Sequence, residues 1–403
     1  MIINHNRHIK IALTYFLFAA FLGVVLRFFS VTVIPINYKF LVHTHSHIAL
    51  LGWVYLALTT LLYKLYLSNL SLDKKYRNIF RFTQVTLIGM LLTFPIMGYA
   101  LFSIIFSTLF LFASYWFAWF FFNNVPISLK KLYSYRCMAS ALWYLLISSL
   151  GPWALGVIMN TLGVESIWYR LAIYFYLHFL YNGWMIMALF GIFLFILESN
   201  QISLSPKNCR RFIWSINLGI VLSFFLSTLF ANPPMLLNFF GGIGGVLQLA
   251  AFGILLNECT KKKEKMNSVF SPFQNRLLMT VAVLLIVKML LQLLTAFPYF
   301  ANLAATYLDF TIGYLHWTFL GVVTLGLFLF LDYFELIKIS RKTSLLYFIG
   351  FLLTEILIFY KGIAAWQGLS IFDGYSSVLA AASFLIPLAL LLLVQKGNST
   401  RIG

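Results

Sequence analysis

Charged residues are scarce in this chain. Asp, Glu, Lys and Arg make up 9% of its 403 residues, against about 25% in soluble globular proteins. Cysteine is rare too, with only Cys137, Cys209 and Cys259 and no Cys-x-x-Cys pair, so we expect neither a disulfide framework nor a thiolate metal site. Hydrophobic residues make up 62% of the chain. This composition excludes a soluble globular domain, a disordered chain and a nucleic-acid binder, and it indicates an integral membrane protein in contact with the lipid bilayer.

Long apolar runs separate the few charges. A helix needs about 20 apolar residues to span a bilayer, so we divide the runs wherever charges or polar clusters interrupt them. The predicted transmembrane helices are 11–33, 41–63, 82–99, 101–122, 138–160, 167–196, 212–231, 234–256, 277–297, 310–331, 344–362 and 375–395. We therefore expect an all-α polytopic membrane protein of about 12 helices, with 1–403 as a single transmembrane domain.

The basic residues predict the orientation of these helices, because cytoplasmic loops hold an excess of Lys and Arg. With the N-terminus inside, all but five of the 28 Lys and Arg fall in segments on the inner side. The exceptions are Arg27, Lys39, Arg170, Lys288 and Lys361. We expect both termini in the cytoplasm of a bacterium, with the chain in the inner membrane, and a formal charge of +18 that reports orientation.

The histidines reveal an internal repeat. One histidine in each of helices two, six and ten is followed five residues later by glycine. These pairs are His47 and Gly52, His178 and Gly183, and His316 and Gly321. Because the three helices are four apart, the chain reads as three quartets, 11–122, 138–256 and 277–395. The glycine lets either a flat cofactor or a neighbouring helix approach the backbone.

Helix two carries two further histidines, His43 and His45. At 100° per residue, His43 and His47 share one face of the helix and His45 lies on the other. For His43 a wet turn at the membrane interface is the plain alternative. Neutral imidazole binds metals and is a standard axial ligand of heme, so we expect these helices to bind heme or a metal. His5 and His8 are expected in a solvated N-terminal tail.

The string from His45 to Trp53, with histidines two residues apart and Gly-Trp after the second, resembles helix two of the catalytic subunit (subunit I) of heme-copper oxidases and nitric oxide reductases. The resemblance implies that His47 or His45, together with His316, holds heme b. It further implies copper or non-heme iron at His178. His43 is another candidate metal ligand on helix two. An electron-donor protein or a quinol is then the expected partner.

Compared with that family, this chain has an incomplete set of histidines. Helix ten has one histidine where the family's oxidases have two, and the seventh predicted helix has none of the expected pair. The chain therefore resembles a divergent short member of the family. Oxygen or nitric oxide reduction is the activity that the resemblance implies, while the missing histidines favour a redox or gas-handling role without the standard binuclear centre.

Ionisable residues within predicted helices mark proton or ion paths, or pair with one another. Lys288 lies in the middle of helix nine and Glu355 in the middle of helix eleven. They are expected either to form an ion pair or to serve as the coupling residues of a proton-coupled secondary transporter, which is the alternative function. Tyr181 is expected to support a metal site from its second shell, and simple aromatic packing is the competing interpretation.

Overall fold

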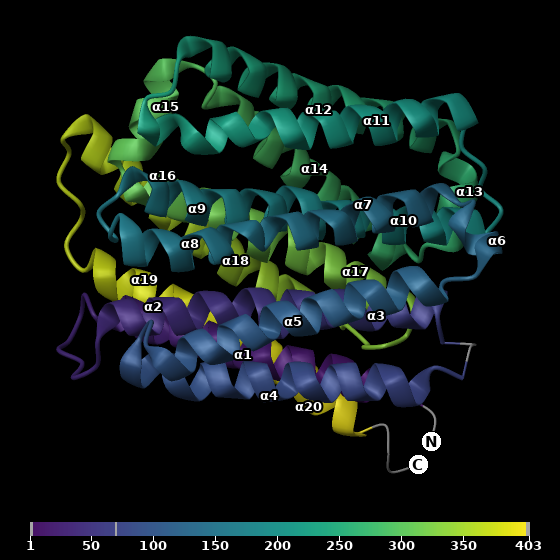
Figure 1. Cartoon of the computed structure of the whole chain (residues 1–403), viewed down its shortest axis with the longest axis horizontal. Helices are drawn as coiled ribbons and strands as arrows, with labels where there is room; N and C mark the ends of the chain where they lie inside the picture. Colours follow the sequence, from purple (N-terminus) through teal and green to yellow (C-terminus); the bar gives the residue numbers. More distant parts are fainter. Residues whose placement is uncertain (1–2, 69–70, 400–403) are drawn as a thin grey trace. The chain divides into compact units, whose positions relative to one another are not determined.

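The computed structural model describes residues 3–68 and 71–399, with side chains described up to 395. Over these residues the chain forms helices and turns, with no strand (Figure 1). Twelve helices within the described part are long and apolar enough to cross a membrane. The prediction of an all-α polytopic membrane protein is confirmed.

The helices divide between two compact units, and the boundary falls inside α17 (Thr324–Tyr333). The first unit contains residues 1–125 and 327–403. Its helices are α1 (His5–Phe28), α2 (Tyr38–His47), η1 (Ile48–Tyr55), α3 (Leu56–Tyr66), α4 (Asp73–Met97), α5 (Leu101–Asn124), α18 (Arg341–Gln367), α19 (Tyr375–Ser383) and α20 (Leu385–Ser399). The elements α2, η1 and α3 follow one another without a break and together form the second membrane-spanning helix.

The second unit contains residues 126–326. Its helices are α6 (Ile127–Lys130), α7 (Tyr133–Ser148), α8 (Leu150–Thr161), α9 (Ile167–His178), η2 (Phe179–Ile186), α10 (Met187–Ser199), α11 (Pro206–Ser223), η3 (Phe224–Ala231), α12 (Met235–Lys261), α13 (Lys263–Val269), α14 (Pro272–Leu294), α15 (Pro298–Thr306), α16 (Leu308–His316) and η4 (Trp317–Val323). The sixth membrane-spanning helix is α9, η2 and α10, and the tenth is α16, η4 and α17.

The N-terminal segment differs from the prediction. We expected helix one at 11–33 with His5 and His8 in a solvated tail, whereas α1 already begins at His5, capped by the side chain of Asn4. His8 is buried and its ring stacks on Phe80, with centroids 3.7 Å apart. The solvated interpretation is wrong for His8, because an N-cap and an aromatic partner extend the helix past its flanking charges.

The three quartets recur in the packing of the helices. The π-helical segment of each second helix packs on the first helix of its own quartet: η1 on α1, η2 on α7 and η4 on α14. Each third helix packs on the fourth. The residue that follows each third helix has a positive φ, at Gly98, Asn232 and Gly368. The helix contacts and the residue with positive φ after each third helix thus recur once in each quartet, as the repeated histidine does.

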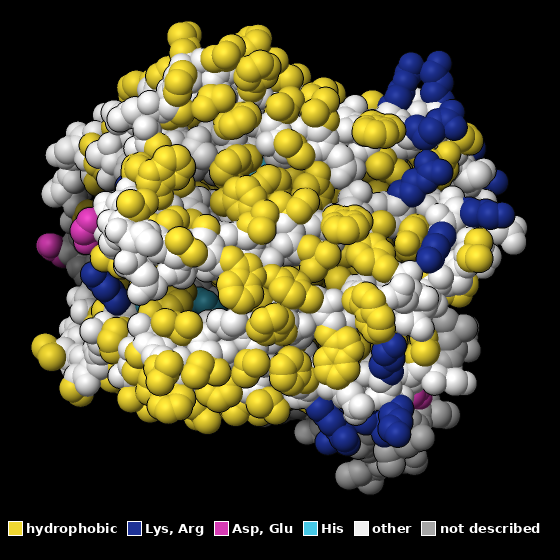
Figure 2. Space-filling view, in the orientation of Figure 1, with side chains coloured by type: hydrophobic (Ala, Val, Ile, Leu, Met, Phe, Trp, Pro, Cys, Tyr) yellow, Lys and Arg dark blue, Asp and Glu magenta, His cyan; other side chains and the backbone are white. Residues whose placement is uncertain are grey.

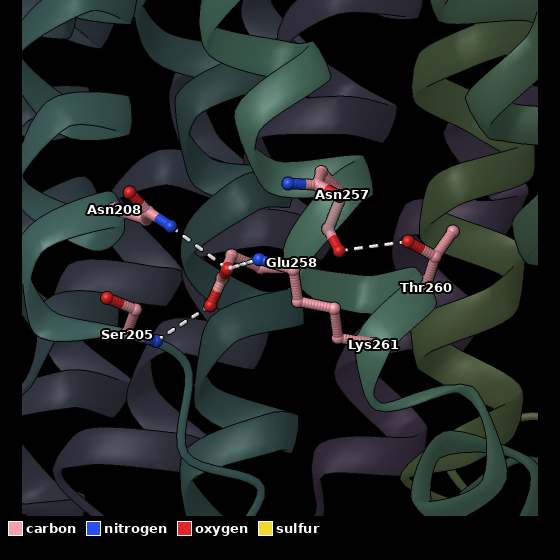
Figure 3. A network of polar contacts seen from close by, with 6 residues as sticks. All are labelled: Ser205, Asn208, Asn257, Glu258, Thr260 and Lys261. Atoms are coloured by element: carbon pink, nitrogen blue, oxygen red, sulfur yellow. Dashed lines mark hydrogen bonds and ion pairs between the residues drawn. The ribbon is translucent and has the colours of Figure 1, made fainter.

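The contact between α11 and α12 shows how these pairs are held. The carboxylate of Glu258, near the end of α12, accepts hydrogen bonds from the Ser205 backbone N–H and the Asn208 amide and forms an ion pair with Lys261 at 2.9 Å (Figure 3). Further along, a Cβ added at Gly244 would meet the backbone of Ser223 on α11. Gly244 therefore serves close helix packing.

Apolar side chains cover the outer faces of the helices. Figure 2 shows hydrophobic side chains over much of the visible surface, with Lys and Arg gathered in groups apart from them. Trp214 and Met235 are among the exposed large apolar residues of the second unit, at 76% and 82% exposure. Surfaces of this kind are stable against lipid tails, so the chain is an integral membrane protein in contact with the bilayer.

Candidate functional site

The three helices that carry the repeated histidines are the most buried spans. In the most apolar part of the second, sixth and tenth spans, 83%, 94% and 67% of the residues are buried, against 33–44% in the other nine described spans. Of the three repeated histidines, His178 is buried, whereas His47 and His316 are partly exposed. Functional groups within a membrane concentrate on helices of this kind.

Each of these helices changes from α-helix to π-helix at its histidine. His47, His178 and His316 are the N-cap residues of η1, η2 and η4. A π-helix joins residues five apart by hydrogen bonds, and the N-cap residue supplies the first acceptor carbonyl. The His-x4-Gly spacing therefore brings histidine and glycine together across one π turn. Such segments are rare and frequently lie at functional sites.

In two π segments a side chain of a neighbouring helix packs directly on the glycine. A Cβ built on Gly52 would lie 2.8 Å from Cβ of Tyr15 on α1, and one on Gly183 would meet Cβ of Tyr144 on α7. Both contacts are with the first helix of the same quartet. Of the two interpretations of the glycine, cofactor approach and helix packing, the structure bears out helix packing at these two positions.

The histidines of helix two point to two sides of α2, as the helical geometry predicted. His43 and His47 both pack on Tyr99, with ring centroids 4.6 and 5.9 Å apart. On the opposite side, the Nδ1 of His45 donates to the carbonyl of Ala19 on α1 at 2.8 Å. Gly23 leaves room for this ring, because a Cβ there would lie 3.1 Å from His45 Cε1.

His47 and His45 share the arrangement that heme ligation requires. The Nδ1 of His47 donates to the His43 carbonyl at 2.8 Å, as His45 does to Ala19. A ligating histidine almost always donates its second ring N–H to a carbonyl or carboxylate, which fixes the tautomer and leaves Nε2 as the ligand atom. The Nε2 of His47 lies 3.3 Å from the Tyr99 hydroxyl. Both residues therefore fit an axial heme ligand.

His178 is arranged differently. It is 3% exposed, and its Nε2 donates to the Ile220 carbonyl at 2.8 Å. In η3, the 3₁₀ segment that follows α11, the Phe224 N–H bonds to the carbonyls of Leu222 and Val221. The Ile220 carbonyl accepts from the His178 ring and, at 3.2 Å, from the Ser223 hydroxyl. Its Nδ1 lies 3.0 Å from the Ser227 hydroxyl and 3.3 Å from the Asn182 amide nitrogen. Both ring nitrogens of His178 therefore contact protein groups, and a metal ion at His178 stays a prediction.

Lys288 lies beside this histidine in the second unit. It is completely buried in α14 and donates hydrogen bonds to Oδ1 of Asn182 and, at 2.5 Å, to Oε1 of Gln292. The Tyr314 hydroxyl of α16 also donates to Gln292 Oε1, at 3.3 Å. A continuous polar chain therefore runs from Ser227 through His178, Asn182, Lys288 and Gln292 to Tyr314, across the sixth, seventh, ninth and tenth spans.

The other predicted site residues lie as follows. Glu355 is buried in α18 of the first unit, at 1% exposure. Tyr181 packs its ring edge-on against Phe319, with centroids 4.4 Å apart, and its role in a second shell stays a prediction. His316 is partly buried at the end of α16. Over residues 3–68 and 71–399 no group of three or more His, Cys, Asp or Glu is placed to hold a metal ion.

Sequence reasoning missed the π segments and the partners of His178. Residues five apart do not share a face of an α-helix, but a π turn joins them. The His-x4-Gly spacing was therefore the available signal for the π segments. Comparison with protein-family models and with curated proteins finds no match to this chain. The proposed function therefore rests on the residues of the site.

Proposed function

We propose that this chain is a heme-binding membrane protein of the heme-copper oxidase type, with a redox or gas-handling role. One observation carries the proposal. In all three quartets a buried helix changes to a π-helix at a histidine. In this proposal the chain lies in a bacterial inner membrane with both termini in the cytoplasm, because segments rich in Lys and Arg stay on the cytoplasmic side.

The ligand atoms support heme more strongly than a separate metal. In helix two, His47 and His45 each keep Nδ1 on a backbone carbonyl and turn Nε2 away from it, which suits heme b. Copper or non-heme iron at His178 would have to displace a contact of that ring with Ser227 or Ile220. When bound, heme b would supply one-electron chemistry or gas binding, and a quinol or electron-donor protein would deliver the electron.

A reduced-minus-oxidised optical spectrum of the purified protein tests the proposal, together with iron and copper analysis. We expect a b-type band that is lost in His316→Ala and in either His47→Ala or His45→Ala. His178→Ala should keep the band and serves as the matched control. Carbon monoxide separates gas handling, in which the spectrum shifts, from electron transfer, in which it does not.

Protein purified from heme-sufficient cells without heme, or with a band that survives all helix-two and helix-ten variants, would refute the proposal. Thermal unfolding of each variant shows whether it still folds. A variant that lacks the band but unfolds at the temperature of heme-free wild-type protein has lost a ligand, whereas unfolding below that temperature indicates a structural role.

Proton-coupled secondary transport is the second candidate function, and the burial of Lys288 favours it. An ammonium group within the membrane is costly and marks a proton or ion path. Potential-driven proton uptake into K⁺-loaded vesicles with valinomycin tests this candidate. We expect the uptake to fall to the protein-free level in Lys288→Met and Glu355→Gln, and uptake at wild-type rate in both variants would contradict it.

A further inference from the structure

Exposed positive charge is concentrated at one end of the helix pair α11 and α12. Lys207, Arg210 and Arg211 lie in the first two turns of α11, and all three side chains are exposed. Four lysines lie where α12 ends and α13 begins: Lys261, Lys262, Lys263 and Lys265. Over residues 205–214 and 257–265 these seven basic residues stand against two glutamates, which gives this end a net charge of +5.

One of the two glutamates holds this end of the pair together. Glu258 of α12 accepts hydrogen bonds from the Ser205 backbone N–H and from the Asn208 amide at the start of α11, both at 2.9 Å. The same carboxylate pairs with Lys261 (Figure 3). The network fixes the first turn of α11 beside the end of α12, so the basic residues of both helices lie at the same end of the pair.

The face of α11 that carries the charges continues as an exposed apolar stripe. Trp214 is 76% exposed, Leu218 50% and Val221 47%. At 100° per residue, these three and the three basic residues of α11 all fall within about 100° of the helix circumference. At 1.5 Å per residue, Trp214 lies about 5 Å and Val221 about 15 Å along the axis from Arg211. Cation, indole and aliphatic side chains thus follow one another along one face.

We propose that this face of α11 binds an anionic phospholipid. The phosphate contacts Lys207, Arg210 and Arg211, since guanidinium groups hold phosphate through two parallel hydrogen bonds. Trp214 lies at the level of the headgroup, where tryptophan is enriched in membrane proteins, and an acyl chain covers the stripe beyond it. The apolar stripe favours a lipid over a soluble phosphate, because a soluble anion would leave that surface uncovered.

Orientation in the membrane accounts for only part of this arrangement. The excess of Lys and Arg on one side of a membrane requires no particular face of a helix. Among the spans that the structure describes, α11 alone has three exposed basic residues in its first two turns and an exposed tryptophan one turn further. Basic clusters at the membrane surface attract anionic headgroups, and on α11 the cluster is joined to a surface for the acyl chain.

Quenching of Trp214 fluorescence by brominated lipid tests the proposal. The full chain is placed in phosphatidylcholine vesicles that contain a fixed minority of either phosphatidylglycerol or phosphatidylcholine brominated in the upper part of its acyl chains. The difference between wild type and Trp214→Phe isolates Trp214 from the rest of the ten tryptophans. One basic residue near an anionic surface contributes about fivefold to binding, so we expect anionic lipid to be enriched about fivefold or more beside Trp214.

Two combined variants show which charges hold the lipid. Lys207→Gln, Arg210→Gln and Arg211→Gln together should reduce the preference of Trp214 for the anionic lipid to about one. The matched control is Lys262→Gln, Lys263→Gln and Lys265→Gln together, which removes the same charge from α12 and α13 and should keep most of the preference. Each variant is paired with its own Trp214→Phe version, and quenching by the brominated neutral lipid shows that it is inserted in the bilayer.

Equal quenching of wild-type Trp214 by the two lipids would overturn the proposal, and this outcome needs no variant to fold. An equal loss of preference in the two combined variants would overturn it as well, because the attraction would then be diffuse and not a property of this face. The comparison of two lipids around one tryptophan does not depend on bound heme, so this test and the heme test fail independently.

Discussion

The packing of each π segment on the first helix of its quartet predicts the effect of a single added methyl group. In Gly183→Ala the new Cβ would meet Cβ of Tyr144, which sits next to the backbone and cannot swing away. The Tyr144 hydroxyl is also fixed, by a hydrogen bond of 3.2 Å to the Asn217 carbonyl. Overpacking of this kind costs about 1–3 kcal/mol. Gly52→Ala should behave alike.

Gly253→Ala is the control for this prediction. Gly253 lies inside α12 with nothing within 4 Å of an added Cβ, so the substitution should stabilise the helix by up to about 1 kcal/mol. The two alanine variants should therefore differ by about 1–4 kcal/mol in the free energy of unfolding, or a factor of about 5 or more in the folded-to-unfolded ratio.

A thiol-reactive dye measures the unfolding, because Cys137 and Cys209 are free and buried and react only when the helices open. The midpoint temperature for Gly183→Ala should lie below that of the wild type, and that for Gly253→Ala at or above it. Equal midpoints for Gly183→Ala and Gly253→Ala would show that the π segment does not press on α7, and the packing argument would fail.

Three further predictions use the same dye assay. Glu258→Gln should destabilise the protein by about 1 kcal/mol, since it weakens the cap on α11 and removes an ion pair, and an unchanged midpoint would contradict the network in Figure 3. Gly98→Ala should lower the free energy of unfolding more than Gly368→Ala does. Both glycines have a positive φ, but only at Gly98 would the added Cβ also meet Phe40, and the reverse order would refute this. The free energy of unfolding of His8→Phe should stay within about 1 kcal/mol of that of the wild type. The stacking on Phe80 is kept, and the contact of 3.5 Å between His8 Nδ1 and the Tyr76 hydroxyl is lost. A larger loss would mean that the imidazole nitrogen matters.

The sequence predicted the features that depend on local composition and period. Apolar runs located the twelve spans, and the recurrence of His-x4-Gly predicted the quartets that the packing repeats. The two faces of helix two followed from the spacing of its histidines. Lys288 and Glu355 are buried, as expected for ionisable residues in mid-span.

The remaining features depend on contacts between distant parts of the chain. Two partners of His178, Ile220 and Ser227, lie 42 and 49 residues away, and the Ile220 carbonyl lies where α11 tightens into η3. Such a local change of helix type is decided by tertiary packing and not by propensity. The amide of Asn182 likewise joins Lys288 across 106 residues. The pairing of Lys288 with Glu355 and the binding of heme stay predictions.

The π segments also determine the rotational register of the helices that contain them. A π turn holds one residue more than an α turn, so the part of the helix before the histidine is turned about the axis relative to the part after the segment. Deleting one residue, such as Leu50 in η1, would restore regular α-helix and rotate His47 by about 100° relative to α3. Each histidine thus owes its direction to one additional residue, and helix two would keep its length and apolarity while its imidazole faced a different neighbour.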